Sequence, residues 1–320
     1  MSAVADRTNA STELGPAAHP AWTPACIEAF ELGTRSFAVD GASAELALVG
    51  GRLELIGPAQ LFEPGDLAYR DTTALSELVG CLRDAGRALA LHRVPSSSPT
   101  IAALRERLPV VQRDAGACPV IHIDGDPEAA LSSRRRSDLR RAQRRADAHG
   151  AVSVEVHVPG VEDVDELLDA AFAIEAQSWK GAAGTALLHD ERRARFYRLL
   201  GRSLAAAGEL RIAFLSIGDR PAAMQIAVER DGALWLLKIG YDERLAAASP
   251  GQLLMLATLR WAYEHDLQRY EFLGASAPWT QTWTHDERPC SAVFAYPLNH
   301  RGAVAFARDA RRHLSGRAER

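Results

Sequence analysis

A strand end followed closely by a helix start is the stretch of this sequence best suited to chemistry. Leu236–Glu243 has the pattern of a strand end, and Ser249–Leu253 opens a helix a few residues later. We expect Ser249 to cap that helix, Pro250 to suit its first turn, and Gly251 to let a ligand approach the backbone. The free amides and the positive end of the helix dipole would bind an anion such as a pyrophosphate. An ordinary capped helix would have the same sequence.

The two lysines of the chain, Lys180 and Lys238, stand in a sequence that otherwise uses arginine as its basic residue. An ammonium and a guanidinium differ chemically, so a lysine kept against such a bias can mark a functional position. The bias alone would also leave a few lysines by chance. Lys238 lies in the strand that precedes the helix start.

Composition narrows the class of protein. The 320 residues are 47% hydrophobic, enough to bury the cores of about two domains. The formal net charge of -4 provides no whole-molecule attraction to DNA or to a membrane surface. No apolar run is long enough for a membrane span, and the first residues lack the pattern of a secretory signal.

The cysteines point to a reducing compartment and away from metal binding. They are scattered, without a CxxC pair: Cys26, Cys81, Cys118 and Cys290. That spacing suits neither a disulfide framework nor a metal site. We therefore expect a cytoplasmic protein without a bound metal.

The pattern of apolar residues predicts two α/β halves joined by a basic helix. The first half has a hairpin around Gly50-Gly51, then helices and strands alternating up to about residue 125. A helix over Ser133–Ala148 carries seven arginines, at positions 134, 135, 136, 140, 141, 144 and 145. The second half then follows, in the order strand, two helices, three-strand meander, helix and strand: Val152–Val158, Asp163–Ser178, Asp190–Ala207, Leu210–Ile217, Ala222–Glu229, Ala233–Gly240, Pro250–His265 and Arg269–Leu273. Another strand near Ala292–Tyr296 and a basic helix over Ala303–Leu314 end the chain.

Short motifs in the second half resemble those of the BioF2-like, or CelD-like, branch of the GNAT superfamily, whose relatives include the FemAB peptidoglycan-bridge enzymes. The matching motifs are Glu175, Trp179-Lys180-Gly181, Lys238-Ile239-Gly240-Tyr241-Asp242, Ser249-Pro250-Gly251 and Tyr270-Glu271-Phe272-Leu273-Gly274. The arginine-rich helix also matches, and the resemblance is clearest over residues 130–296. The chain departs from the family where Ala277–Trp283 replaces a common Tyr-Lys pair.

The resemblance implies an α/β fold with a mixed sheet, made of tandem GNAT-like domains of which the first is degenerate. The expected boundaries are a disordered tail over residues 1–20, a degenerate half over 21–130, an arginine-rich linking helix over 131–150 and an acyltransferase half over 151–320. Only the second half has the Ser-Pro-Gly loop.

The implied activity is transfer of an acyl group, acetyl or longer, from acyl-CoA to an amine. The resemblance places the coenzyme A pyrophosphate on the turn formed by Ser249, Pro250, Gly251, Gln252 and Leu253, and it implies that Lys238 also binds the coenzyme. No metal is implied as a cofactor.

Direct transfer needs a base for the amine proton and a donor for the developing oxyanion. The acidic residues inside the matched motifs are Glu175, Asp242 and Glu271, and a carboxylate removed from water becomes a better base. Each could instead form a salt bridge with a lysine. Tyr241 could protonate the leaving thiolate, although strand alternation puts it on the side of Ile239, where it could pack in the core.

The acceptor is expected to be a small amine, with an amino sugar or a polysaccharide precursor as the working hypothesis. Trp179, Lys180, Trp279 and Trp283 are the expected contacts to it, although the body of Trp179 could lie in the core. His285 fits a solvated surface position better than a catalytic one.

Two other functions remain open. A FemAB-like enzyme would take its acyl group from aminoacyl-tRNA, and the arginine-rich helix could grip an RNA backbone, although most such helices are solvated faces. A degenerate GNAT pair could also serve as a non-catalytic scaffold in polysaccharide assembly. The intact Ser-Pro-Gly loop weighs against the scaffold.

Overall fold

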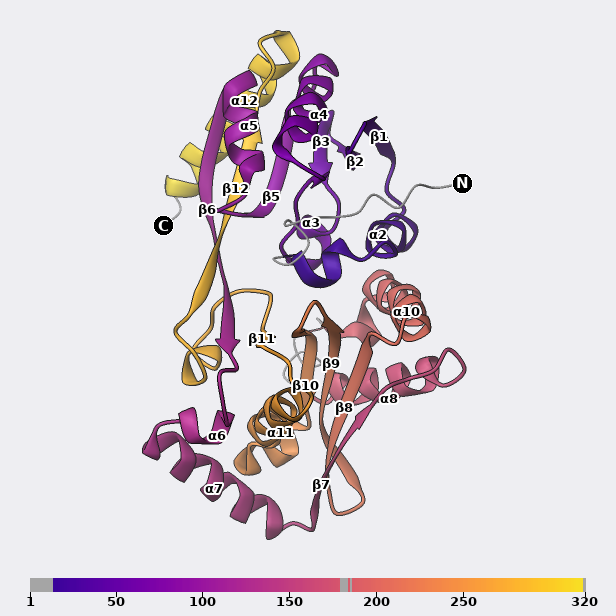
Figure 1. Ribbon diagram of the computed structural model, residues 1–320, viewed down its shortest axis with the longest axis vertical. Coiled ribbons are helices and arrows are strands. Elements are labelled where there is room, and N and C mark those ends of the chain that lie inside the picture. The colour runs from indigo at the N-terminus through magenta and orange to yellow at the C-terminus, as the bar shows by residue number, and fades with distance from the viewer. Residues whose placement is uncertain (1–13, 179–183, 185, 319–320) are drawn as a thin grey trace. The chain divides into compact units, whose positions relative to one another are not determined.

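The computed structural model describes residues 14–178, 184 and 186–318, and it divides into two compact units (Figure 1). Unit 1 contains residues up to Ala117 together with Arg288–Arg320, and unit 2 contains Cys118–Glu287. Strand β6 (Val110–His122) passes from unit 1 into unit 2.

Unit 1 begins with a short 3-10 helix and α2, followed by a meander, a crossover helix and further strands. Its elements are η1 (Gly15–Ala18), α2 (Trp22–Phe30), β1 (Thr34–Val39), β2 (Ala42–Val49), β3 (Arg52–Leu55), α3 (Pro58–Leu61), β4 (Ala68–Tyr69), α4 (Thr72–Asp84), β5 (Leu89–Pro95), α5 (Pro99–Arg107), β12 (Glu287–Ala295) and α12 (His300–Ala318). Strands β1, β2 and β3 pair antiparallel in sequence, β5 joins β3 in parallel, and β12 pairs antiparallel with β5.

The sequence of α4 explains why this crossover forms. The Asp71 carboxylate accepts a hydrogen bond from the Ala74 amide and so caps the helix. Apolar residues at helical spacing then bury one face of α4 against the sheet: Leu75, Leu78, Val79 and Leu82.

Unit 2 has the basic helix, two helices, a meander, a crossover helix and a short parallel strand. Its elements are α6 (Pro127–Ala130), α7 (Ser133–Asp147), β7 (Val152–His157), α8 (Val164–Ala176), η2 (Leu187–His189), α10 (Glu191–Ala206), β8 (Leu210–Ile217), β9 (Arg220–Arg230), β10 (Ala233–Tyr241), η3 (Glu243–Ala248), α11 (Pro250–Glu264), β11 (Arg269–Glu271) and η4 (Thr280–Thr282). Strands β7 to β10 pair antiparallel in order, β11 joins β10 in parallel, and β6 pairs antiparallel with β11.

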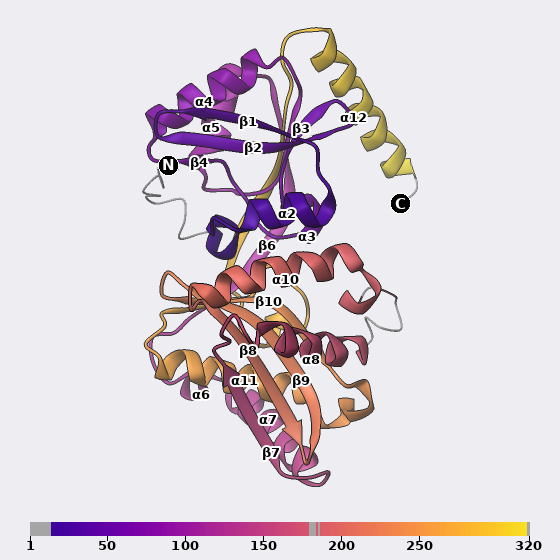
Figure 2. The ribbon, with the colours of Figure 1, turned by 90° about the vertical axis from the view of Figure 1, so that its right-hand side faces the viewer.

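The helices of unit 2 cover both faces of its sheet. Figure 2 shows α8 over strands β8 and β9, with α10 beside it and α11 on the opposite face. Buried apolar residues of β9, β10 and β11 pack against α11, so the α11 face is closed by a hydrophobic core.

The two units share one order of elements: a three-strand antiparallel meander, a crossover helix, a parallel fourth strand and an antiparallel neighbour. The predicted α/β fold with a mixed sheet is confirmed. The compact units group residues 288–320 with unit 1, whereas the sequence boundaries put them in the second half, because β12 pairs with β5. Of the expected tail, residues 1–13 lie outside the described residues, and Gly15–Ala18 is the 3-10 helix η1.

Candidate active site

The strands β10 and β11 form a fork in the sheet of unit 2. They pair only at the start of β10, where Ala233, Leu234 and Trp235 face residues 269–271. Strand β10 then continues to Tyr241, while β11 ends at Glu271. Beyond Trp235, β10 is therefore not paired with β11, and the two strands part.

A β-bulge lies at the base of this fork. The register between β10 and β9 shifts between Leu236 and Lys238. A bulge adds one residue to a strand and turns its side chains and amides to new directions, which is why bulges are frequent near active sites. The amides of Leu236–Lys238 are accordingly the candidate donors to an oxyanion.

The helix α11 starts just beyond the end of β10 without a side-chain cap. The prediction that Ser249 caps the helix is wrong: its backbone is left-handed, with φ of 53° and ψ of 48°, and its side chain makes no capping hydrogen bond. A capping side chain needs an extended backbone at that position. The Ser249 carbonyl instead accepts from the amides of Gln252 and Leu253 at 3.0 and 3.2 Å. Among the described residues, no hydrogen bond occupies the amide of Gly251.

The basic helix α7 borders this loop. It packs on η3 and α11, where the Arg145 Nε donates to the Ala247 carbonyl and Arg135 donates to the Gln252 Oε1. The Arg135 guanidinium also stacks 4.3 Å above the ring of Trp283, and burial lowers its pKa below the ordinary arginine value. Further arginines of α7 are exposed: Arg134, Arg140, Arg141 and Arg144.

Glu175 reaches the opposite face of β10. A Cβ added to Gly240 would lie 2.7 Å from the Glu175 Cα, so only glycine allows α8 to pack this closely against the strand. The Glu175 side chain is fully buried, and its Oε2 accepts a hydrogen bond of 2.9 Å from the Leu187 amide. The Gly240 position of the matched motif thus brings a buried carboxylate to the open part of β10.

Lys238 and Glu271 lie on the same face as Glu175. Lys238 is two residues from Gly240, and its Nζ is 5.5 Å from the ring centre of Tyr197 on α10. Glu271 is 1% exposed and lies on the face opposite Tyr270, because neighbouring strand residues alternate. Lys238 therefore points away from the α11 turn with which the sequence motifs group it.

Asp242 is the predicted acid with the most complete set of partners. Its carboxylate accepts from the Arg244 Nε at 2.9 Å and from the Arg244 amide at 3.0 Å, and it is fully buried. The side-chain hydrogen bond to Arg244 lowers the pKa of Asp242 below its ordinary value. These contacts fit a group that fixes the start of η3 better than they fit a proton acceptor.

Tyr241 lies on the α11 face, as strand alternation predicts. A Cβ at Gly251 would be 3.5 Å from the Tyr241 Cδ1, an ordinary contact. The phenol is half-buried and packs beside the core of α7, α11 and η3. Tyr241 therefore adjoins the loop that is the candidate anion site.

A buried polar network below the fork was not predicted. The Gln225 Oε1 accepts from the Thr258 Oγ1 at 2.8 Å and from the Tyr270 hydroxyl at 3.0 Å. All three side chains are at most 3% exposed, and burial raises the pKa of Tyr270 above its ordinary value. The network joins β9, α11 and β11, the elements that hold the fork open. Nothing in the local sequence pattern distinguishes Gln225, Thr258 and Tyr270 from the other polar residues of these elements.

The remaining predicted contacts divide into two groups. Trp283 is 9% exposed and its Nε1 donates to the Gln252 Oε1 at 3.0 Å, while Trp279 packs edge-on against Phe272. Both tryptophans thus line the α11 side of the site. Trp179 and Lys180 lie outside the described residues.

Searches for other kinds of site gave no candidates within the described ranges. No group of three or more His, Cys, Asp or Glu is arranged to hold a metal ion in that part of the chain. Nor does any helix there have the length and apolar composition needed to cross a bilayer.

Comparisons with known proteins agree with this geometry. Residues 133–281 match the family model described as an acetyltransferase (GNAT) domain, the stretch that contains α7, the fork and α11. Among curated proteins, none matches the sequence significantly.

Solved structures match over most of the chain at low identity. FemX is 11% identical over 89% of this chain and 94% of its own, with a TM-score of 0.60. L-PGS from Bacillus licheniformis is 14% identical over 88% and 93%, with a TM-score of 0.57. A conserved protein of unknown function from Bacteroides thetaiotaomicron is 14% identical over 91% and 92%, with a TM-score of 0.59. Such likenesses show a shared fold, and the match to the acetyltransferase (GNAT) model is confined to residues 133–281.

Proposed function

We propose that this chain is an N-acyltransferase that moves an acyl group from coenzyme A to a primary amine, at the fork between β10 and β11. One combination of features carries the proposal. Two parallel strands part, and the helix that starts directly beyond them has no side-chain cap. An extended thioester can lie where β10 and β11 part, while its phosphates lie at the helix start.

The loop residues fit a pyrophosphate. Pro250 has no amide hydrogen, the Gly251 amide has no partner among the described residues, and no carboxylate caps the helix. Gly251 adds no side chain to the surface that the phosphates would approach. The dipole of α11 and the neighbouring Arg145 of α7 both favour negative charge there.

The chemistry needs few groups. The neutral amine nitrogen attacks the thioester carbonyl carbon, a C–N bond forms, and the negative charge on the oxygen is held by amides of the bulged segment Leu236–Lys238. Glu175 takes the proton from the attacking nitrogen, since it is the buried carboxylate packed against the open strand. The C–S bond then breaks, and the thiolate takes a proton from Tyr241 or from solvent.

The acceptor site is proposed on the α8 face, where Lys238 and Glu271 accompany Glu175. The two charges of opposite sign suit a polar amine such as an amino sugar. Trp279 and Trp283 would then border the donor rather than the acceptor, because they lie with Gln252 on the α11 side.

Aminoacyl-tRNA is a second candidate donor, and the position of α7 favours it. Exposed arginines continue from the α11 loop along this helix, where an RNA backbone could extend beyond the phosphates nearest the site. Acyl-CoA is the preferred donor because the α11 start has no side-chain cap and lies directly after the strand that parts from β11, which suits a pyrophosphate joined to an extended acyl arm.

Turnover with each donor separates the two candidates. The full chain is mixed with acetyl-CoA and a panel of amino sugars, polyamines and amino acids, and thiol release and acylated product are measured. Amine-dependent thiol release supports the proposal. Transfer from aminoacyl-tRNA alone, falling steeply with salt concentration, would replace acyl-CoA by RNA.

A further inference from the structure

Arg135 of α7 lies beside the start of α11, and its close contacts are neutral groups. Its Nη2 donates to the Gln252 Oε1, and its guanidinium lies 4.3 Å above the ring of Trp283. Gln252 is the third residue of α11, one position after Gly251. The guanidinium is therefore placed beside the helix start that the phosphates of the proposed donor would approach.

No carboxylate forms an ion pair with this guanidinium in the part of the chain that the structure describes. Asp138, the nearest acid along α7, is paired with Arg141 instead. The Arg135 Nε is buried and has no hydrogen-bond acceptor there. Burial lowers the pKa of Arg135, and the charge of Asp138 opposes that shift only in part. A cation that has lost water without gaining an anionic partner is less stable, and an anionic ligand would restore the partner.

The groups that contact Arg135 hold it in one direction. Trp283 is 9% exposed, and its Nε1 donates to the same Gln252 Oε1 at 3.0 Å. Trp283 also belongs to one buried core with Leu139 of α7 and Met255 of α11. The face of an indole attracts a guanidinium but does not neutralise its charge. The cluster thus presents a positive charge in a fixed position.

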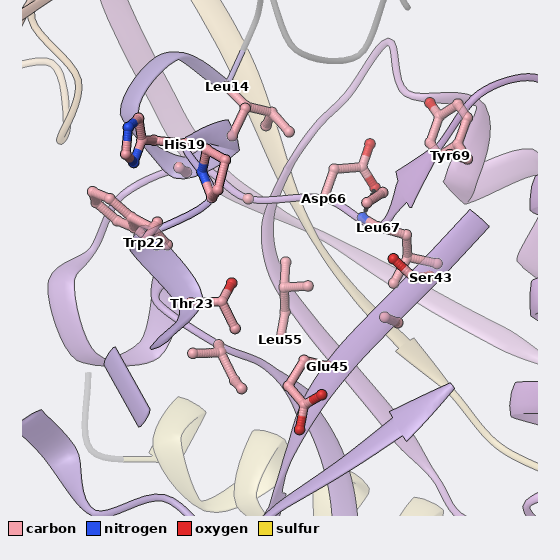
Figure 3. A pocket seen from close by; sticks show the side chains of 17 residues that line it. Leu14, His19, Trp22, Thr23, Ser43, Glu45, Leu55, Asp66, Leu67 and Tyr69 are labelled. Carbon is pink, nitrogen blue, oxygen red and sulfur yellow. Dashed lines mark hydrogen bonds between the residues drawn. The ribbon is translucent and has the colours of Figure 1, made fainter. Parts of the chain in front are cut away.

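The corresponding helix start of unit 1 has the opposite arrangement of charges. Arg70 forms ion pairs with Asp40 and with Asp71, the residue that caps α4. The loop before α4 also lines a cavity of about 200 Å³, and Figure 3 shows the acids Glu45 and Asp66 at this cavity. None of the described residues that line it is a lysine or an arginine. The arginine beside the crossover helix is thus neutralised by acids in unit 1 but not in unit 2.

We propose that Arg135 makes this chain selective for donors that carry phosphate, because its guanidinium binds a phosphate group of the donor beside the α11 loop. The proposal rests on the donor site proposed above for unit 2 and names the side chain that recognises the donor there. The planar guanidinium can give two parallel hydrogen bonds to one phosphate. Coenzyme A offers two sources of that phosphate: its pyrophosphate and the 3′-phosphate of its ribose.

Calorimetric titration of the full chain with coenzyme A tests this role. Arg135→Gln is expected to weaken binding by about tenfold or more, because it removes the charge that faces the phosphate. Arg135→Lys keeps the charge but loses the planar shape, and it should recover most of that loss. Arg70→Gln is the matched control, since it removes the paired arginine at the helix start of unit 1 and should bind as the wild type does.

Titration with 3′-dephospho-coenzyme A separates the two sources of the phosphate. If the effect of Arg135→Gln disappears with this probe, the guanidinium binds the 3′-phosphate. An effect of the same size with both probes assigns it to the pyrophosphate.

Unchanged coenzyme A affinity in Arg135→Gln would overturn the proposal and leave the donor site standing. Equal losses in Arg135→Gln and Arg135→Lys would also overturn it, because they would mean that the guanidinium only packs α7 against α11. Inorganic pyrophosphate is titrated into the same samples. Pyrophosphate binding that depends on Arg135, in a protein that does not bind coenzyme A, would support the phosphate site and contradict the proposed donor. A wild type that binds neither probe would overturn both.

Discussion

The same order of strands and helices leads to different loops in the two units. In unit 2 the helix after the fork begins at a left-handed Ser249 and has no side-chain cap. In unit 1 the corresponding helix is capped by the Asp71 carboxylate, which takes the Ala74 amide at 2.9 Å. A carboxylate at a helix start occupies the position where a phosphate would bind.

The two units also differ in what packs against a glycine at the end of the third meander strand. Gly240 lets α8 bring the Glu175 backbone against β10, while Gly57 lets α2 bring the Trp22 ring against the end of β3. One unit thus places a carboxylate beside its third strand, and the other an indole. The repeated fold therefore determines where a site can lie. The residues of the loop before the crossover helix, and those packed against the glycine, determine what the site binds.

The largest expected effect is the loss of activity when the carboxylate of Glu175, which unit 1 lacks at the corresponding place, is removed. Glu175→Gln keeps an oxygen for the Leu187 amide but removes the proton acceptor, so kcat is expected to fall by about 10²–10⁴-fold with little change in coenzyme A affinity. Steady-state kinetics and calorimetry check this. Glu166→Gln, on the exposed side of the same helix, is the control. An unchanged kcat in Glu175→Gln would assign the proton to water or to another group.

The second-largest effect is expected from a methyl group added at Gly240, where α8 packs closely against β10. Gly240→Ala places a Cβ 2.7 Å from the Glu175 Cα and should cost about 1–3 kcal/mol of unfolding free energy. Gly80→Ala, in the middle of α4, meets only an ordinary contact of 3.6 Å and should instead stabilise by about 0.5–1 kcal/mol. Urea unfolding of both variants tests this contrast in sign, and a neutral Gly240→Ala would contradict the close packing.

The ion pair that fixes the start of η3 should show in the pH dependence of stability. The folded pKa of Asp242 is lowered, so its contribution is present at neutral pH and is lost as pH falls below about 4, the ordinary value of the group. Arg244→Ala should lower stability at pH 7 only modestly, since Arg244 is 64% exposed and its charge is screened by solvent. The difference from wild type should shrink towards pH 3 in unfolding titrations. A constant difference would show that the pair is not the cause.

The smallest expected effect is the difference in stability between alanine variants at the two helix starts. Asp71→Ala removes a capping bond and should cost about 0.5–2 kcal/mol. Ser249→Ala removes no capping bond and should change stability by less than about 0.5 kcal/mol. Thermal unfolding of the two variants in parallel measures the difference. Equal losses would mean that Ser249 caps α11 in solution.

The sequence predicted the elements of unit 2 more completely than those of unit 1. The meander, α11 and the basic helix have strong periodicity and clear turn residues, and the predicted ranges lie within a few residues of β8, β9, β10 and α11. In unit 1 the hairpin, α4, β5 and α5 were predicted, but α2 and β1 were not. The strand Val110–His122 was predicted only at its end, because polar residues interrupt its apolar pattern.

Within the site, local motifs were readable and long-range contacts were not. Ser249-Pro250-Gly251 marks the loop from sequence alone. The approach of Glu175 to Gly240 spans 65 residues of chain and depends on how α8 packs, and the bond from Arg244 makes Asp242 a structural group. The left-handed backbone of Ser249 was also hidden, because serine is a common cap and rarely adopts that conformation.

Coenzyme A binding to the wild type and to Gly251→Trp tests the central claim most directly, with Asp71→Asn as the control in unit 1. The account predicts one saturable coenzyme A site per chain, abolished by the indole at the α11 loop and unchanged by the variant in unit 1. Binding that survives in Gly251→Trp, or a wild type that binds no coenzyme A, would contradict the assignment of the donor site to the fork of unit 2.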